Sequence, residues 1–416
     1  MNYRKTHLKK MLGAISVAAM AAVLFSGQAM AETVTKGGKK FVKVDGELFP
    51  ALQALTPPGI PKDNPQSVDA NGWPIWEDPK VQLGYKLFFE PALSGDGSVP
   101  CVTCHKPDEG WSLSSSISRG YPGISHWLNS QTILNTANLG KLFWDGHKLS
   151  LEAQAPSAAQ GLSGNGKSDM MEQRLYQVPE YRKAFKAIFG SDRNMVKDSW
   201  RAIAAFERAM NTPETPFDQY MRGDKGALSA DQVRGLKIFE GKGRCIMCHN
   251  GPLLTDEKYY NVGLPDQPQF WDDPIKQAGH RSQMYSRGQP EYMFRKTNTH
   301  PGVYLSTHLK QDIGKFRTAP LRHLEYTPPF MHNGMFDDLE AVIDFYNKGG
   351  DKDRTLRDYG IANKTKRLKK LDLTDGEKAD LLAFLESLSG DEHLLPTPKL
   401  PAPAVMTATE STFSRK

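Results

Sequence analysis

The sequence contains two copies of one five-residue pattern, and this repeat constrains the fold more than any other feature. The copies are Cys101-Val-Thr-Cys104-His105 and Cys245-Ile-Met-Cys248-His249. Each matches C-x-x-C-H, in which two thiols attach a haem covalently and the following histidine ligates the iron. All four cysteines of the chain lie in these strings, so none remains for a disulfide. The sequence therefore predicts two covalently bound c-type haems.

The N-terminus predicts export. Four basic residues precede an apolar run at 11–25, and small residues follow at 29–31. This is the pattern of a secretory signal peptide comprising residues 1–31. The apolar run is short for a membrane span, so no stable span is expected. We therefore expect the mature protein in the periplasm, where c-type haem is assembled.

A lone C-x-x-C also occurs in zinc knuckles and redox dithiols, but the repeated histidine and the exported setting favour haem.

The net charge of the chain gives no reason to expect a nucleic-acid partner. The formal charge is +6 for the full sequence, and removal of the four basic residues in 1–31 lowers it to +2. Four ionised haem propionates would lower it further, to about −2. The basic character of the sequence thus comes mostly from the signal peptide.

A weak internal repeat indicates two domains. Leu83–Phe88 precedes the first haem string, and Arg234–Phe239 precedes the second, with Ser229 as a candidate helix N-cap. The two haem histidines are 144 positions apart, which leaves room for one small domain per haem.

Apolar spacing near 3.6 residues predicts further helices at 195–210, 339–346 and 376–388. Alternation typical of strands is scarce, so the expected fold class is mainly α, with two cytochrome c-like domains. Pro- and Gly-rich stretches at 56–65 and 394–403 predict extended arms, and the stretch at 211–216 predicts an interdomain linker. The predicted organisation is an N-terminal extension (32–75), an N-terminal haem domain (76–215), a C-terminal haem domain (216–390) and a tail (391–416).

Four further strings carry a family resemblance. They are Pro91-Ala-Leu-Ser94, Phe143-Trp-Asp-Gly146, Tyr260-Asn-Val-Gly-Leu-Pro265 and Pro329-Phe-Met-His-Asn-Gly334. Because these strings occur in this order around two haem motifs, the chain resembles bacterial dihaem cytochrome c peroxidases and the related MauG enzymes. The resemblance extends from about residue 80 to residue 390.

Tyr346 separates the two branches of this superfamily. Conventional dihaem peroxidases have an axial methionine fourteen residues after the histidine that corresponds to His332, whereas MauG-type enzymes have a tyrosine there. Counting fourteen residues from His332 reaches Tyr346. By spacing alone, Leu339, Val342 and Tyr346 form an apolar helical stripe, in which Tyr346 would be a core aromatic. The resemblance instead implies that His249 and Tyr346 ligate the C-terminal haem. A phenolate is a hard anion that stabilises ferric and higher iron states.

The N-terminal haem, held by Cys101, Cys104 and His105, would then bind peroxide. Relatives often carry a removable distal histidine where this chain has Tyr121. Nearby, His126 could ligate after a loop rearrangement, or it could be a surface or propionate-bonded histidine. Relatives also have a distal glutamate that moves protons. The corresponding segment, 160–169, has no aligned glutamate, and Asp169 is its nearest carboxylate.

The resemblance assigns further candidate residues. It implies that Trp144 lies between the haems as an electron relay; the structural alternative is a tryptophan that fills a domain interface. His332 and Gln154 are candidate catalytic residues, Gln154 near the variable ligand of the C-terminal haem. An interdomain calcium site would take an amide oxygen and two backbone carbonyls. The residues that match it are Asn129, Thr327 and Pro329.

The predicted function is that of a periplasmic MauG-like dihaem enzyme. Hydrogen peroxide would generate a high-valent two-haem state, which oxidises a partner protein at a tryptophan side chain by long-range electron transfer. The amine-dehydrogenase maturase has a surface tryptophan where this chain has Gly243, so a different partner is expected, such as a copper-binding protein. The alternatives are a conventional peroxidase that draws electrons from a small cytochrome or cupredoxin, and a non-catalytic dihaem electron conduit.

Overall fold

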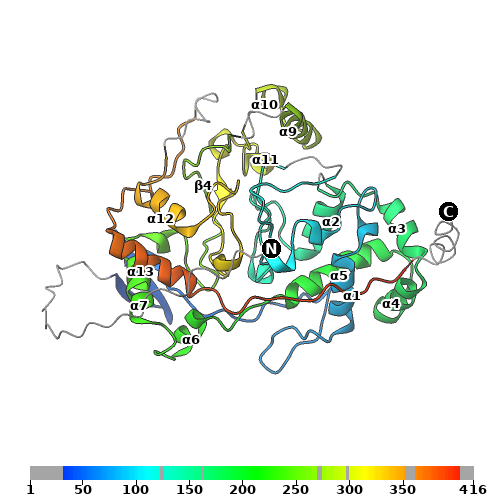
Figure 1. Ribbon diagram of the computed structural model, residues 1–416, viewed down its shortest axis with the longest axis horizontal. Coiled ribbons are helices and arrows are strands. Elements are labelled where there is room, and N and C mark those ends of the chain that lie inside the picture. Colours follow the sequence, from blue (N-terminus) through cyan, green and yellow to red (C-terminus); the bar gives the residue numbers. More distant parts are fainter. Residues whose placement is uncertain are drawn as a thin grey trace, which may run out of the picture. The chain divides into compact units, whose positions relative to one another are not determined.

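Helices dominate the regular structure of the computed structural model (Figure 1). The structure describes residues 31–121, 126–161, 163–268, 274–296, 299–351 and 361–402, so the predicted signal peptide lies outside the described residues except for Ala31. The prediction of a mainly helical fold is confirmed. Among the described residues, no helix has the length and apolar character needed to cross a membrane.

The helices and strands have the following bounds. The helices are α1 (Pro79–Phe88), α2 (Leu151–Gln160), α3 (Ser168–Tyr176), α4 (Pro179–Phe189), α5 (Met195–Ala209), α6 (Pro216–Arg222), α7 (Ala230–Glu240), α9 (Pro274–Ser286), α10 (Glu291–Lys296), α11 (Tyr304–Thr307), α12 (Leu339–Asn347) and α13 (Asp375–Glu386). Strands β1 (Glu32–Lys36), β2 (Lys39–Val44) and β3 (Glu47–Pro50) form an antiparallel sheet, and β4 (Tyr259–Tyr260) pairs with β5 (Phe316–Arg317).

Two helix crossings explain the internal repeat. Helix α1 packs across α5, and α7 packs across α13. A Cβ atom on Gly84 of α1 would lie 1.9 Å from the carbonyl oxygen of Ala202, and one on Gly235 of α7 would lie 1.9 Å from that of Asp380. Only glycine lets the two backbones approach this closely. The repeated glycine therefore fixes the same kind of helix crossing before each haem string.

The predicted helix boundaries agree with the structure to within a few residues. Ser229 caps α7 through a reciprocal capping box with Gln232, as its position before the apolar repeat predicts. The predicted helices at 195–210, 339–346 and 376–388 correspond to α5, α12 and α13.

The buried apolar residues form two large clusters. The first draws its buried members from 83–210 and includes α1 and α5; the second joins α7, α12 and α13 to the N-terminal sheet. Val42, Val44 and Phe49 of that sheet are buried in the second cluster. The C-terminal tail, by contrast, packs Leu395 and Leu400 against the first cluster. The N-terminal sheet and residues 395–400 thus each pack against the cluster remote from them in sequence. The proposed domain boundaries stay a prediction.

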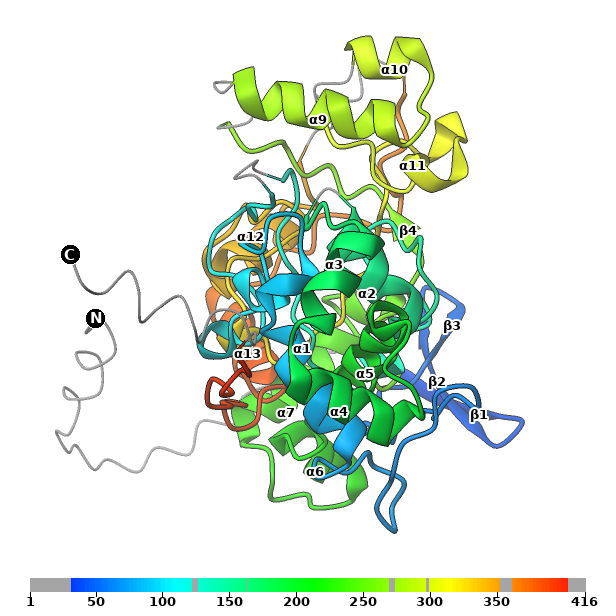
Figure 2. The same ribbon diagram turned by 90° about the vertical axis from the view of Figure 1, so that its right-hand side faces the viewer.

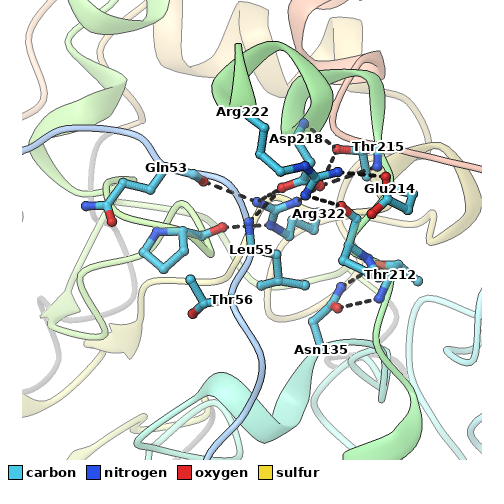
Figure 3. Close-up of polar contacts among 12 residues, drawn as sticks. Gln53, Leu55, Thr56, Asn135, Thr212, Glu214, Thr215, Asp218, Arg222 and Arg322 are labelled. Carbon is cyan, nitrogen blue, oxygen red and sulfur yellow. Dashed lines mark hydrogen bonds and ion pairs between the residues drawn. The ribbon is translucent and has the colours of Figure 1, made fainter. Parts of the chain in front are cut away.

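A buried ion pair ties the N-terminal arm to the second half of the chain (Figure 3). Asp218 of α6 accepts hydrogen bonds from both terminal nitrogens of Arg322, at 2.7 and 2.9 Å, and from the backbone N–H of Leu55 at 2.7 Å. The side chains of Arg322 and Asp218 are 2% and 0% exposed. Because both charges are buried, each depends on the other for its compensation.

Helices α9, α10 and α11 form a group of their own (Figure 2). They follow β4 in sequence and end before β5, so the two short strands hold the base of this insertion. The ring of His280 in α9 stacks on Trp127 with the ring centroids 3.8 Å apart. This contact joins the insertion to the segment that follows the first haem string.

Candidate active site

Both C-x-x-C-H strings fold into the same turn. A 3-10 turn covers Cys101–Thr103 in one string and Cys245–Met247 in the other. The backbone N–H of His105 donates to the carbonyl of Cys101 at 3.2 Å, and that of His249 donates to the carbonyl of Cys245 at 2.8 Å. In each string the turn therefore holds the backbone of the histidine against that of the first cysteine.

Each haem-string histidine has one ring nitrogen held by the backbone. Nδ1 of His105 lies 3.3 Å from the carbonyl oxygen of Trp111, and Nδ1 of His249 lies 2.9 Å from that of Leu254. Burial lowers the pKa of both imidazoles, which favours the neutral form. A neutral imidazole that donates through Nδ1 keeps the lone pair of Nε2 for a metal.

One cavity of about 1370 Å³ is lined by both haem strings. Pockets for a single small ligand commonly measure about 300–1,000 Å³, so this volume exceeds what one such molecule needs. The walls include all four cysteines, both string histidines and the other predicted site residues Trp144, Gln154, His332, Tyr346, Asn129, Thr327 and Pro329. The thiols, the imidazoles and the volume fit two macrocycles attached by thioether bonds.

The four cysteines are all unpaired. Burial raises the pKa of Cys101 and Cys245 to about 12, so both remain neutral thiols in this environment. In the described part of the chain, no three His, Cys, Asp or Glu side chains come together as metal ligands. The two cysteine pairs therefore do not meet in a zinc-type cluster.

Tyr346 lines the cavity from the last turn of α12. Of the predicted apolar stripe, Leu339 is buried, whereas Val342 and Tyr346 are half-buried. Burial raises the pKa of the Tyr346 hydroxyl, and the nearby thiols of Cys248 and Cys245 raise it further. The phenol thus lies close to the second haem string, in a place where only a strong partner such as a metal would hold it as phenolate.

Trp144 is held between the two halves of the chain. Its indole N–H donates to the backbone carbonyl of Asn129 at 2.8 Å, and its own carbonyl accepts from the N–H of Arg317 in β5 at 2.8 Å. The Nε of Arg317 also donates to the carbonyl of Phe143 at 3.1 Å. These bonds fix both the backbone and the ring of Trp144 on the cavity wall.

His332 lies beside Trp144. Its ring stacks on Phe316 with centroids 3.6 Å apart and meets the ring of Trp144 edge-on at 6.3 Å. Burial lowers the pKa of His332 to about 3, so this imidazole is neutral. No sequence pattern pointed to Phe316. The pairing of β5 with β4 places its ring where it stacks on His332.

The three predicted calcium ligands come from two neighbouring loops. The backbone N–H of Asn129 donates to the carbonyl of His332 at 2.8 Å, which joins the Asn129 segment to the loop that contains Thr327 and Pro329. The Asn129 side-chain N–H groups donate to the carbonyls of Leu113 and Ser115 at 3.4 and 3.1 Å. All three predicted ligands line the cavity.

Some candidate residues line the cavity, and one lies outside it. His126, beside the predicted peroxide site, and Gln154 of α2, predicted near the variable ligand of the C-terminal haem, both line the cavity. Among the residues that the structure describes, the buried His126 Nε2 and Gln154 Oε1 have no hydrogen-bond partner. His126 as a whole is half-buried, and Nε2 is its buried ring nitrogen. Asp169 is exposed at the start of α3 and lines a separate small hollow, so it does not replace the missing glutamate.

Sequence reasoning missed an ionic cluster next to Trp144. Asp145 accepts a hydrogen bond from Nδ1 of His147 at 2.6 Å and from Arg287 at 3.2 Å, and Ser306 donates to it at 3.3 Å. Burial alone would raise the pKa of Asp145, but the His147 and Arg287 contacts lower it to about 2. Asp145 and His147 adjoin the tryptophan in sequence, whereas Arg287 comes from the insertion and carries no motif.

A second missed group is Glu207 at the end of α5. It lines the cavity, is 5% exposed and lies near Cys101, whose pKa it raises. Burial raises the pKa of Glu207 to about 8, so this carboxyl is largely protonated at neutral pH. In the sequence, Glu207 could be noticed only as a charged residue on an otherwise apolar helical face.

Comparison with known proteins agrees with this site. Residues 78–226 match the model of the di-haem cytochrome c peroxidase family. The chain is 48% identical to cytochrome-c peroxidase IdrP1 of Pseudomonas sp. (strain SCT), over 84% of this chain and 89% of that protein. It is 34% identical to the methylamine utilization protein MauG of Methylorubrum extorquens, over 77% and 81% of the two chains.

Solved structures show the same fold. A MauG-like protein associated with microbial copper homeostasis superposes with a TM-score of 0.64 at 27% identity, covering 81% of this chain and 93% of that one. The di-haem peroxidase BthA of Burkholderia thailandensis superposes with a TM-score of 0.59 at 22% identity, covering 86% and 98%. The resemblance inferred from the motifs is confirmed, and the chain belongs to the di-haem cytochrome c peroxidase and MauG family of oxidoreductases.

Proposed function

We propose that this protein is a periplasmic, MauG-like enzyme that uses hydrogen peroxide to oxidise a partner protein at a tryptophan side chain. It would hold two covalent c-type haems, one in each of two cytochrome c-like domains, and one calcium ion between the domains. His105 would ligate the N-terminal haem, and His249 and Tyr346 would ligate the C-terminal one. The haems, when bound, would supply the redox chemistry with peroxide.

The position of Tyr346 carries this proposal. Its phenol lies on the wall of the cavity, close enough to Cys245 and Cys248 for these two residues to raise the pKa of its hydroxyl. A neutral methionine at this place would favour ferrous iron and raise the reduction potential, which suits electron exchange with a small cytochrome or cupredoxin. A phenolate favours oxidised iron and therefore suits the storage of oxidising power for a substrate that is hard to oxidise.

Trp144 would conduct between the two haem sites. Its ring is fixed by the bond to Asn129, and its backbone by the bond to Arg317, so little reorganisation would accompany a change in its charge. The indole N–H already has an acceptor, which is the arrangement expected of a buried tryptophan that is held rigidly.

The proposed partner is a copper-binding protein. The structurally similar MauG-like protein is associated with microbial copper homeostasis, which supports this choice. At position 243, where the amine-dehydrogenase maturase carries a surface tryptophan, this chain has a glycine that lines the cavity. A Cβ atom there would lie 2.8 Å from the carbonyl of Ile238, so a tryptophan would not fit without a backbone shift.

The test is the Tyr346→Phe variant of the holoprotein. We expect both haems to remain attached, the ferric absorption and electron paramagnetic resonance spectra to lose the signature of the tyrosinate ligand, and oxidation of the partner to cease. Tyr260→Phe is the matched control, because Tyr260 also lines the cavity but donates its hydroxyl to Asp256 at 2.8 Å. An unchanged ferric spectrum in Tyr346→Phe would make Tyr346 a core aromatic and remove the basis of the proposal.

A conventional peroxidase is the second candidate, favoured by the 48% identity to proteins named cytochrome-c peroxidase IdrP1. Its electrons would come from a small cytochrome or cupredoxin. Rapid peroxide consumption driven by such a reduced carrier, with no modified protein product, would support this candidate. A protein inert towards peroxide would instead be a dihaem electron conduit.

A further inference from the structure

The predicted peroxide site lacks a carboxylate in the loop where relatives have one. Residues of the 160–167 loop line the cavity, but the described members are glycine, serine, asparagine, glutamine and lysine. A Cβ atom on Gly164 would lie 2.3 Å from the carbonyl oxygen of Ala159, so this position holds no side chain in the present backbone. The group that handles the proton of peroxide must therefore come from elsewhere on the cavity wall.

His126 lies against this loop. The N–H of Tyr121 donates to the carbonyl of Ser163 at 2.8 Å, which fastens the 118–121 segment to the loop. A Cβ atom on Gly120 would lie 2.8 Å from that same carbonyl oxygen and 2.6 Å from Nε2 of His126. The imidazole thus occupies the space between these two segments.

The Nε2 atom of His126 is buried and has no hydrogen-bond partner among the described residues, while the residue lines the cavity. Its backbone is fixed, because its N–H donates to the carbonyl of Ser118 at 2.7 Å. A buried polar atom without a partner costs free energy, so such an atom in a functional cavity indicates a partner that is not part of the chain. A small polar molecule in the cavity would supply it.

Arg287 provides a positive charge near this imidazole. Its guanidinium donates to Asp145 at 3.2 Å, and Asp145 is held in turn by His147 at 2.6 Å. Burial lowers the pKa of His126 to about 4, and the charge of Arg287 contributes to this effect. At neutral pH the imidazole is therefore neutral and able to accept a proton.

We propose that His126 is the proton acceptor for hydrogen peroxide in this protein and that Arg287 stabilises the anion produced. In this step an O–H bond of hydrogen peroxide breaks, an N–H bond forms at Nε2 of His126, and a hydroperoxide anion remains; no electron moves. Arg287 lines the same cavity and is close enough for its charge to act on His126, so it would attract the negative charge of the anion. This inference rests on the proposed reaction with peroxide and names the residue pair that replaces the carboxylate of the relatives.

The experiment compares the wild-type holoprotein with His126→Gln and Arg287→Gln. Two rates are measured by rapid mixing: the spectral change with hydrogen peroxide and the binding of cyanide to the ferric protein. Hydrogen cyanide enters as a neutral weak acid and binds as an anion, so it reports on the proton acceptor without any redox step. Because general base catalysis contributes about 10²–10⁴-fold, we expect His126→Gln to lower both rates by about 100-fold. Arg287→Gln should also lower both.

The control is Arg281→Gln, because Arg281 of α9 is exposed and does not line the cavity. It should leave both rates unchanged. The variant His126→Glu restores a base and should react faster than His126→Gln. If His126→Gln does not fold, the rates of His126→Glu and Arg287→Gln are compared with those of the wild type. Unchanged rates in His126→Gln would overturn the inference. An altered ferric spectrum in His126→Gln would also overturn it, because the imidazole would then be an iron ligand.

The same experiment separates this inference from the proposed function. A wild-type protein that does not react with peroxide contradicts the proposed function, yet its cyanide binding still decides the role of His126. A wild-type protein that reacts with peroxide at the same rate as His126→Gln contradicts the inference and leaves the proposed function intact.

Discussion

The indole N–H of Trp144 donates a hydrogen bond of 2.8 Å to the backbone carbonyl of Asn129. This bond connects the predicted electron relay directly to the predicted calcium ligand. Asn129 in turn donates its backbone N–H to the carbonyl of His332, so three candidate site residues form one hydrogen-bonded series. A change at any of the three is therefore expected to affect the other two.

The first prediction concerns Trp144→Phe. The phenyl ring keeps most of the apolar volume but leaves the Asn129 carbonyl without its donor, so we expect a loss of about 1–3 kcal/mol in the free energy of unfolding. Both haems should remain, and peroxide-driven oxidation of the partner should fall at least tenfold while oxidation moves to nearby Met and Tyr side chains. Peptide mass spectrometry after peroxide treatment measures this shift.

Trp76→Phe is the matched control for this variant. Trp76 packs against the first apolar cluster and does not line the cavity. It should leave the oxidation of the partner unchanged. Partner oxidation at the wild-type rate in Trp144→Phe would show that electrons take another route and that Trp144 has a structural role alone.

The second prediction concerns haem attachment. Because the two C-x-x-C-H turns have separate thiols and separate histidines, replacement of Cys101 and Cys104 by alanine should remove one covalent haem and leave the other. Replacement of Cys245 and Cys248 should do the same for the second string. Intact-mass measurement of the periplasmic protein should give residues 32–416 plus two haems for the wild type and one haem fewer for each double variant. A bound zinc ion in the wild type would contradict the scheme.

The third prediction concerns the buried pair in Figure 3. Asp218→Asn removes the charge that compensates Arg322 while both side chains remain buried, so we expect a loss of about 3–5 kcal/mol in the free energy of unfolding. Denaturant titration followed by tryptophan fluorescence and haem absorption gives this value. Glu214→Gln is the control, because Glu214 pairs with Arg222 at the surface and should change the stability by less than about 1 kcal/mol. Equal effects in the two variants would contradict the structural assignment.

The fourth prediction concerns calcium. If Asn129, Thr327 and Pro329 hold the ion, a chelator should lower the thermal midpoint of the holoprotein, and added Ca²⁺ should restore it. A ligand at 100 times its dissociation constant stabilises the folded state by about 2.7 kcal/mol, which is readily measured. Asn129→Ala should abolish the difference between the chelated and Ca²⁺-loaded protein. A chelator effect of full size in Asn129→Ala would place the ion elsewhere.

Several parts of the fold were predictable because they depend on local chemistry. The capping residue Ser229 and the apolar spacing of α5, α12 and α13 determine helices through contacts within a few residues. The family could also be recognised, since its motifs combine residue types with fixed spacing. The position fourteen residues after His332 pointed to Tyr346, and α12 places that residue on the cavity wall.

Other features depended on the tertiary structure. The N-terminal sheet packs on the second apolar cluster and the C-terminal tail on the first, a crossing of the chain ends that no local pattern encodes. Asp169 is close in sequence to the expected glutamate but lies outside the cavity, while Arg287 is 142 positions from Asp145 and contacts it. Proximity along the chain was a poor guide for these charged groups, because their positions depend on how loops pack.

The sequence by itself determined the pattern from which covalent haem attachment is predicted: two thiol pairs, each with its histidine, and a glycine in the helix before each pair. These are properties of residue type and short spacing, so they need no knowledge of the packing. Only the tertiary structure decided why those glycines are needed, since Gly84 and Gly235 meet the backbones of α5 and α13, more than 100 residues away. It also decided which polar groups share the cavity, because long-range packing brings His126, Asp145 and Arg287 to its lining.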